Sequence, residues 1–201
     1  MSALSSEQFD ATLVDVRKAY RLLYSYQRRV MDTIQLIGEK FDRYEPLGFP
    51  LFSGMAPREG GKVNFDSWAW DWLPMYCYEF YFGKAVIGSD EYDFAISIYS
   101  DSGWEDNLGE HDQTEVENFA VPEKSGSWIY MYVGRNMWKP KSFEDDWSSA
   151  TSDEFQEQSE TGKFISRRLP LSELMTEDAI VVAVDSFKAY CIRQGMGDLF
   201  D

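Results

Sequence analysis

The stretch SWAWDWLPMYCYEFYFG, residues 67–83, decides the fold, because an aromatic side chain stands at nearly every second position. Successive side chains of a β-strand point to opposite faces of the sheet, so this spacing is typical of a strand with one aromatic face. Pro74 lacks the amide hydrogen that a central strand needs, and we therefore expect an approach segment at 67–73 and the strand proper at 75–83. The aromatic row consists of Trp68, Trp70, Trp72, Tyr76, Tyr78, Phe80 and Phe82.

The alternation returns further along the chain and predicts an antiparallel sheet of about four strands. Residues 92–100 and 127–135 show it clearly, and residues 162–171 show it more weakly. Short connections rich in Gly, Ser and Asp, such as the one between the first two strands, favour antiparallel hairpins. We interpret the aromatic row as the wall of a core beneath a helix, with a ligand-stacking surface as the alternative.

A long amphipathic helix is predicted before the sheet. Ser5 and Gln8 have the spacing of a capping box, and apolar residues then recur at alternating intervals of four and three residues. The helix should span about residues 6–42 and measure about 55 Å, which exceeds the diameter of roughly 33–35 Å for a compact domain of this size. Part of it must therefore overhang the body, bend, or pack against another chain. The stripe consists of Phe9, Leu13, Val16, Tyr20, Leu23, Gln27, Val30, Ile34, Ile37 and Phe41.

The stripe has two interpretations that the sequence leaves open. Packing across the aromatic sheet accounts for a long apolar seam without a partner. Self-association through the overhanging part is the alternative, and Gln27 would then resemble the polar residue that fixes the register of a coiled coil.

A second helix is predicted at 177–194, with Thr176 as its N-cap. The order of helix, sheet and helix predicts an α+β fold, in which a long N-terminal helix and a C-terminal helix pack on an antiparallel sheet. At 201 residues the chain fits a single domain, residues 1–201, with the aromatic-rich sheet and its loops at 67–171.

Charge is the strongest global signal. The formal net charge is −16, from 19 basic and 35 acidic residues. Residues 1–45 are neutral, so the whole excess lies in residues 46–201. A field of this sign repels nucleic acid and anionic lipid and accelerates encounter with basic partners, so we expect direct binding of neither nucleic acid nor membrane.

The cysteines and the N-terminus suggest a cytoplasmic location. Cys77 and Cys191 lie within apolar patterns and are expected to be buried free thiols, as in a reducing compartment. The first residues show neither the basic nor the apolar part of a signal peptide, and no apolar run is long enough for a membrane span.

Standard catalytic and metal-binding motifs are missing from the sequence, and we expect no cofactor, no metal and no enzymatic activity. His111 is the only histidine, and no glycine-rich phosphate-binding motif follows a strand. An enzyme or small-ligand binder, with or without a divalent metal, is kept as the alternative. Its site would lie on the opposite face of the first two strands, where Glu79 would be a catalytic carboxylate; the structural alternative for Glu79 is an ion pair with Arg135 or Arg167. The residues of this alternative sheet-face site are Glu79, Tyr81 and Asp93.

Two acidic segments, residues 101–118 and 142–160, are the predicted partner-binding surface. Each places a tryptophan beside carboxylates, a combination that suits a basic protein partner. The residues expected to bind this partner are Asp101, Trp104, Glu105, Asp106, Glu110, Asp112, Glu115, Glu117, Glu144, Asp145, Asp146, Trp147, Asp153 and Glu154.

The leading hypothesis is therefore a non-catalytic interaction protein that binds and neutralises a basic partner, such as a nuclease or another nucleic-acid-binding protein. Inhibitors, immunity proteins and nucleic-acid mimics act through the same physics. A structural subunit that forms homo-oligomers through its N-terminal helix is a further alternative.

Overall fold

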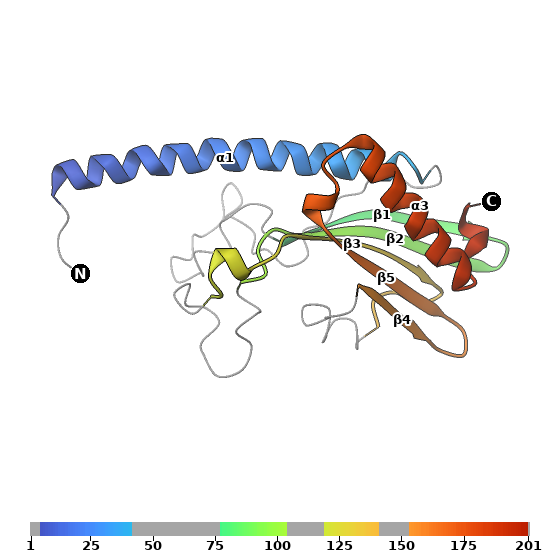
Figure 1. The fold of residues 1–201 in the computed structure, drawn as a ribbon. Coiled ribbons are helices and arrows are strands. Elements are labelled where there is room, and N and C mark those ends of the chain that lie inside the picture. The colour runs from blue at the N-terminus through green and yellow to red at the C-terminus, as the bar shows by residue number, and fades with distance from the viewer. Residues whose placement is uncertain (1–4, 42–76, 104–118, 141–152, 201) are drawn as a thin grey trace, which may run out of the picture.

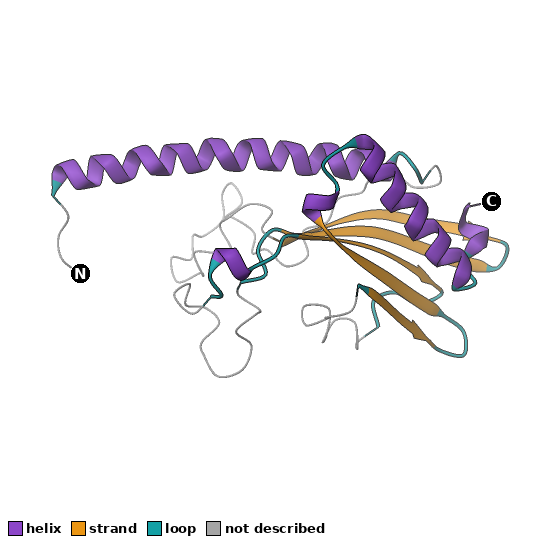
Figure 2. Cartoon of the chain, viewed as in Figure 1, coloured by secondary structure: helices purple, strands orange, loops and turns teal. Residues whose placement is uncertain are grey.

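A computed structural model describes residues 5–41, 77–103, 119–140 and 153–200. A long helix precedes an antiparallel sheet, and a shorter helix follows it (Figures 1 and 2). The elements are α1 (Ser6–Gly38), β1 (Cys77–Ile87), β2 (Asp90–Tyr99), β3 (Trp128–Arg135), β4 (Glu154–Gln158), β5 (Lys163–Pro170) and α3 (Glu177–Arg193), with short 3₁₀ turns at Pro122–Lys124, Leu171–Glu173 and Gly197–Phe200.

The predicted α+β architecture is confirmed, with one strand more than expected. The described strands form a five-stranded sheet in the order β1-β2-β3-β5-β4, and every neighbouring pair is antiparallel. β1 and β2 are joined by a tight turn in which Gly88 has a φ of 63°, a left-handed conformation that favours glycine. The additional strand, β4, lies within the second acidic segment.

A bulge in β1 limits the aromatic alternation. Tyr81 pairs with Ala95 but the next paired residue is Lys84, and Gly83 has a φ of 92°. Phe80, before the bulge, and Phe82, within it, face the helices, and after the bulge the odd-numbered Ala85 does. The interpretation of the aromatic row as a core wall is confirmed for its described residues, whereas Trp68, Trp70, Trp72 and Tyr76 lie outside them.

Both helices cover the same face of the sheet, which we call the helix face (Figure 1). Phe41, just beyond α1, stacks on Phe94 of β2 with ring centroids 4.1 Å apart. Phe187 of α3 is fully buried in the same cluster. Thr176 caps α3 by accepting a hydrogen bond from the Ala179 amide, as predicted.

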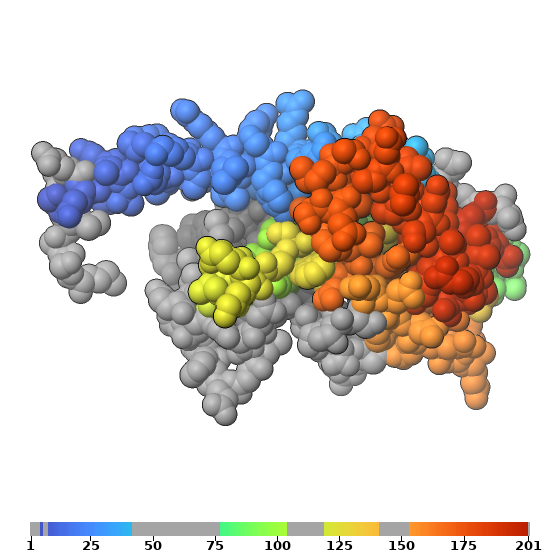
Figure 3. Space-filling view, in the orientation of Figure 1, coloured from blue at the N-terminus to red at the C-terminus, as the bar shows by residue number. Residues whose placement is uncertain are grey.

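Only the C-terminal half of α1 packs on the body. Ser5 and Gln8 form the predicted capping box at its start, but the described side chains from residue 8 to residue 25 are exposed, except for the half-buried Leu13. Burial begins near Tyr26, whose hydroxyl donates to Ser100 over 2.8 Å. The N-terminal part of the helix therefore projects beyond the sheet (Figure 3).

Packing on the sheet consequently accounts for less than half of the apolar stripe. Val30, Ile34, Ile37 and Phe41 are at most 4% exposed. In contrast, Phe9 is 54%, Val16 42% and Tyr20 71% exposed.

We expect the two halves of α1 to differ sharply in their contribution to stability. Val30→Ala should lower the free energy of unfolding by about 2 kcal/mol, because it removes two buried methyl groups and leaves a cavity. Val14→Ala is the matched control, since Val14 is 41% exposed against 1% for Val30, and it should change stability by less than about 0.5 kcal/mol. Urea unfolding followed by circular dichroism measures both values. Equal losses would contradict the packing described here.

Candidate functional site

A buried polar cluster lies on the second face of the sheet, opposite the helices. Glu79 on β1 is 3% exposed and Ser97 on β2 is 1% exposed, and the two residues pair in the strand register. The Tyr132 hydroxyl, on β3, donates a hydrogen bond to Glu79 Oε2. Because this uses the only hydroxyl hydrogen of Tyr132, the 2.6 Å contact between its oxygen and Ser97 Oγ is donated by Ser97.

Lys139 completes this cluster by forming an ion pair with the same oxygen of Glu79. Its side chain is 10% exposed, and its ammonium group lies 5.4 Å from the centre of the Trp138 ring. The prediction that Arg135 or Arg167 supplies the partner of Glu79 is wrong. Arg135 donates to the Gly195 carbonyl and Arg167 donates to Ser186, both away from the cluster.

A tight reversal of the chain after β3 brings Lys139 under the sheet. Asn136 and Lys139 have φ values of 49° and 40°, which are uncommon for residues with a side chain. Gly134 permits the reversal, because a Cβ atom at this position would lie 1.9 Å from the Met137 carbonyl oxygen. Trp138 then packs against Tyr132, with ring centroids 5.6 Å apart. Backbone strain of this kind is retained where the surrounding structure holds a side chain in place.

The chemistry of this cluster is that of a satisfied ion pair. Burial, followed by the charge of Glu79, raises the pKa of Tyr132 well above its usual value, so this residue remains a hydrogen-bond donor. Glu79 has both a cation and a donor on one oxygen, which opposes action as a general base. The cluster therefore holds β1, β2, β3 and the reversal together.

Tyr81 and Asp93 form a second polar contact near the edge of the same face. The Tyr81 hydroxyl donates to Asp93 Oδ1 over 2.5 Å. Burial raises the pKa of the Asp93 carboxyl, against the opposing effects of the Tyr81 hydrogen bond and the Lys84 charge. Burial and the bond to Asp93 raise the pKa of Tyr81. The three residues of the alternative sheet-face site thus take part in two separate sets of contacts.

Metal ligands do not gather among the described residues: no group of three His, Cys, Asp or Glu side chains there could hold an ion. Cys77 and Cys191 are buried free thiols, as predicted. Burial raises the pKa of the Cys191 thiol, which favours its unreactive protonated form.

Three of the predicted partner-binding residues lie within the described structure, and each has a local role. Asp101 Oδ1 accepts a hydrogen bond from the Gly103 amide over 2.8 Å. Asp153 pairs with Arg168 at 3.4 Å, and Glu154 pairs with Arg193 at 3.7 Å. The others lie outside the described residues: Trp104, Glu105, Asp106, Glu110, Asp112, Glu115, Glu117, Glu144, Asp145, Asp146 and Trp147.

Both acidic segments attach to the same end of the sheet. The first follows Tyr99 at the end of β2, and Tyr99 pairs with Trp128 at the start of β3. The second is described from Asp153 onward, where the Asp153 carbonyl accepts a hydrogen bond from the Arg168 amide over 2.8 Å. β4 then carries this segment toward the opposite end, where Gln158 pairs with Lys163. Arg168 pairs with Tyr130 near the start of β3, so both attachment points lie at one end (Figure 1).

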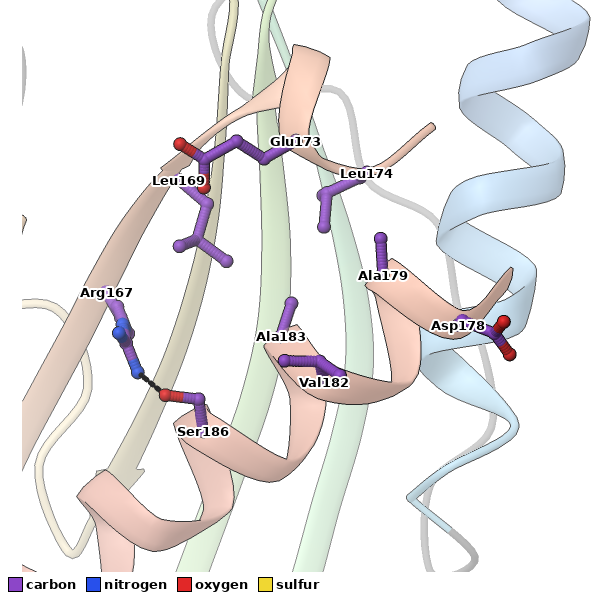
Figure 4. Close-up of a pocket in the computed structure, with 9 residues that line it drawn as sticks. All are labelled: Arg167, Leu169, Glu173, Leu174, Asp178, Ala179, Val182, Ala183 and Ser186. Atoms are coloured by element: carbon purple, nitrogen blue, oxygen red, sulfur yellow. Dashed lines mark hydrogen bonds between the residues drawn. The ribbon is translucent and has the colours of Figure 1, made fainter. Parts of the chain in front are cut away.

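A groove of about 380 Å³ opens between the end of β5 and α3 (Figure 4). Its charged residues are Arg167, beside Ser186 at one end, Asp178 at the other end, and Glu173 in the wall. Arg167 donates to Ser186 over 2.6 Å, so its guanidinium group is already engaged. The walls are formed by Leu169, Glu173, Leu174, Ala179, Val182 and Ala183.

Sequence reasoning missed Lys139 and the strand β4. Lys139 carries no periodic signal, because its position depends on a left-handed reversal. In β4 the structure half-buries Phe155 and Glu157 while their neighbours are exposed, but the sequence EFQEQ has Phe155 as its only apolar residue and so offers no alternation to detect.

Comparison with known proteins identifies one family. The model of the family described as PM0109 matches residues 6–196, and that description names no activity. No curated protein and no solved structure matches the chain. Within the described residues, no helix is both long and apolar enough to cross a membrane.

Breaking the buried ion pair should destabilise the fold strongly. Lys139→Met leaves Glu79 with an uncompensated charge and should lower the free energy of unfolding by about 3–5 kcal/mol. The double variant Glu79→Gln/Lys139→Met should lose less than Lys139→Met alone, because the introduced glutamine is neutral and can still accept the bond from Tyr132.

The control for this cycle is Lys84→Met, which breaks the exposed ion pair between Lys84 and Glu91 and should have little effect. Chemical denaturation of the wild type, Glu79→Gln, Lys139→Met and the double variant measures the coupling, and Lys84→Met is compared beside them. Similar losses for Lys139→Met and Lys84→Met would show that the buried pair does not support the fold.

Asp93 should reduce stability at neutral pH. Because its pKa is raised in the folded state, folding favours the protonated carboxyl, and this advantage is lost as the pH rises through the folded pKa. Asp93→Asn imitates the protonated form and keeps an acceptor for Tyr81. Its melting temperature should exceed that of the wild type at about pH 7 and approach it at about pH 3.

Asp185→Asn, at an exposed position on α3, is the control and should shift the melting temperature little at either pH. A lower melting temperature for Asp93→Asn at neutral pH would contradict the raised pKa. Thermal unfolding across this pH range makes the comparison.

Proposed function

We propose that this chain, which belongs to the PM0109 family, is a non-catalytic acidic protein that binds and neutralises a basic protein partner. The partner is of the class that normally contacts phosphates, such as a nuclease or another nucleic-acid-binding protein. Carboxylates of the two acidic segments take the place of the phosphates.

One observation carries this proposal: two segments of high negative charge density each have a described residue at the same end of the sheet, Asp101 and Asp153, although the second segment then continues through β4 toward the other end. Residues 101–118 and residues 142–160 each contain seven carboxylates and neither lysine nor arginine. Asp101 follows Tyr99, and Asp153 is bonded to Arg168 at the same end, whereas Glu157 and Glu160 lie in β4 and the turn after it, toward the opposite end. A high density of like charge produces a field that raises the encounter rate with a cationic surface.

The sheet cluster supports the same proposal indirectly. Glu79 is compensated by Lys139 and Tyr132, and Asp93 is bonded to Tyr81. These carboxylates are used in holding the sheet together, which favours the acidic segments over the sheet face as the functional surface. The buried free thiols suit a cytoplasmic location, which forms part of the proposal.

The test begins with capture of partners on the immobilised protein at about 50 mM and about 500 mM NaCl, because exposed charges are screened at the higher concentration. We expect one basic protein to be retained at low salt and released at high salt. An empty eluate at both concentrations, or retention that does not depend on salt, would overturn the proposal. A rise in melting temperature with micromolar Mg²⁺, Mn²⁺ or Ca²⁺ would favour the sheet-face alternative instead.

Association kinetics with the captured protein then locate the surface. Glu105→Lys/Asp106→Lys and Asp145→Lys/Asp146→Lys should each slow association about tenfold at low salt and change dissociation much less. Asp32→Lys/Asp185→Lys makes the same change in net charge at exposed positions outside the segments and should slow association less. An equal effect of all three variants would show that net charge acts without these segments.

A further inference from the structure

The projecting part of α1 is an apolar surface that the body leaves exposed. From Ser6 to Ser25 the helix extends about 30 Å before it meets the sheet. Its seam over this length consists of Phe9, Leu13, Val16, Tyr20 and Leu23, of which Leu13 is half-buried and the others are at least 36% exposed. Exposed apolar residues at such regular intervals mark a surface that another helix can cover.

We infer that this seam binds the seam of a second copy of the chain, forming an antiparallel two-helix coiled coil. The seam is continuous with the residues that pack on the sheet, so it faces the side of α1 on which the body lies. A parallel partner helix would run along the seam into the sheet of the first copy. An antiparallel partner leaves in the opposite direction, and the two bodies then lie at opposite ends of the coiled coil.

The charges beside the seam select one register. Asp10 and Arg17 occupy the same heptad position, on one side of the seam, while the other side carries the small neutral Thr12 and Ala19. Antiparallel helices bring equivalent flanking positions together. When the crossing is centred between Val14 and Asp15, Asp10 of each copy lies beside Arg17 of the second copy.

The same register also matches the seam residues. Phe9 then lies opposite Tyr20 of the second copy, and Leu13 lies opposite Val16 of the second copy. Sliding one helix by a heptad in one direction places Arg17 beside Arg17, and in the other direction places Asp10 beside Asp10. The shift that places Arg17 beside Arg17 would also bring the start of the partner helix opposite Val30, where the sheet already packs on α1.

The available area indicates a dimer of moderate affinity. The paired region covers residues 6–23. The five seam side chains of the first copy and the five of the second copy bury a total area on the order of 1,000 Å². This lies at the lower end of the range for specific interfaces, so a dissociation constant in the micromolar range is expected. The dimer should therefore form as the concentration rises from about 1 to about 200 µM.

A matched pair of variants tests the seam. Val16 lies on it and is 42% exposed, whereas Val14 lies two positions away on the outer side of the helix and is 41% exposed. Sedimentation of the full chain should show concentration-dependent dimers for the wild type and for Val14→Asp, and at least tenfold weaker association for Val16→Asp. Circular dichroism verifies that both variants keep the helix. A wild type that remains monomeric up to about 200 µM, or equal effects of the two substitutions, would overturn the inference.

A charge exchange tests the register. Asp10 and Arg17 are about 10 Å apart along their own helix, too far for a direct ion pair within one chain. Asp10→Arg and Arg17→Asp should each weaken the dimer about tenfold at low salt, because two symmetric pairs become repulsive. The double variant restores opposite charges and should return the affinity to within about threefold of the wild type.

A double variant as weak as the single variants would overturn the antiparallel register. Glu105→Lys/Asp106→Lys, which tests the proposed function, leaves the seam intact and should dimerise like the wild type. Sedimentation can therefore refute the dimer without refuting the binding of a basic partner, and association kinetics can refute that binding without refuting the dimer.

Discussion

The packing of the end of α1 on the aromatic face of β1 and β2 is the interaction on which the other features depend. Phe94 lies at its centre, stacked on Phe41 at 4.1 Å and in contact with Phe82 at 5.2 Å. Burying three aromatic rings together contributes several kcal/mol and fixes the position of the helix on the sheet. Because the helix is held by its C-terminal half, the rest of its length projects from the body. The exposed seam is thus a consequence of where the aromatic core lies.

The second face of the sheet follows a different rule. It buries polar groups, and buried polar groups must find partners within the protein. Glu79 therefore requires Lys139, and Lys139 reaches it only through a strained reversal that Gly134 permits. The ion pair helps to hold the strained reversal in place, because the attraction between Glu79 and Lys139 offsets part of the cost of the strain. In this arrangement a mid-strand carboxylate, which in an open cleft would indicate catalysis, supports the fold instead.

The sequence predicted the features that arise from local periodicity. Alternation located β1, β2, β3 and β5, the stripe and Ser5 located α1, and Thr176 located the start of α3. It could not show that the stripe is buried only from Val30 onward, because burial depends on where the sheet ends in space. It assigned Glu79 to the wrong cation for a similar reason: a left-handed reversal has no periodic signature, whereas the arginines lie on predicted strands. β4 was hidden because its acidic residues resemble a solvated loop, although alternate positions are half-buried.

The distribution of charge separates the two surfaces of the molecule. Residues 1–45 are neutral, while the rest of the chain carries the whole net charge of −16. Two bodies of this charge repel each other, and an antiparallel crossing of the helices keeps them at opposite ends. A neutral helix is needed for this, since an acidic one would add its own repulsion to that of the bodies. Salt then acts differently on the two surfaces: it screens the attraction between the acidic segments and a basic partner, whereas the apolar seam retains its affinity.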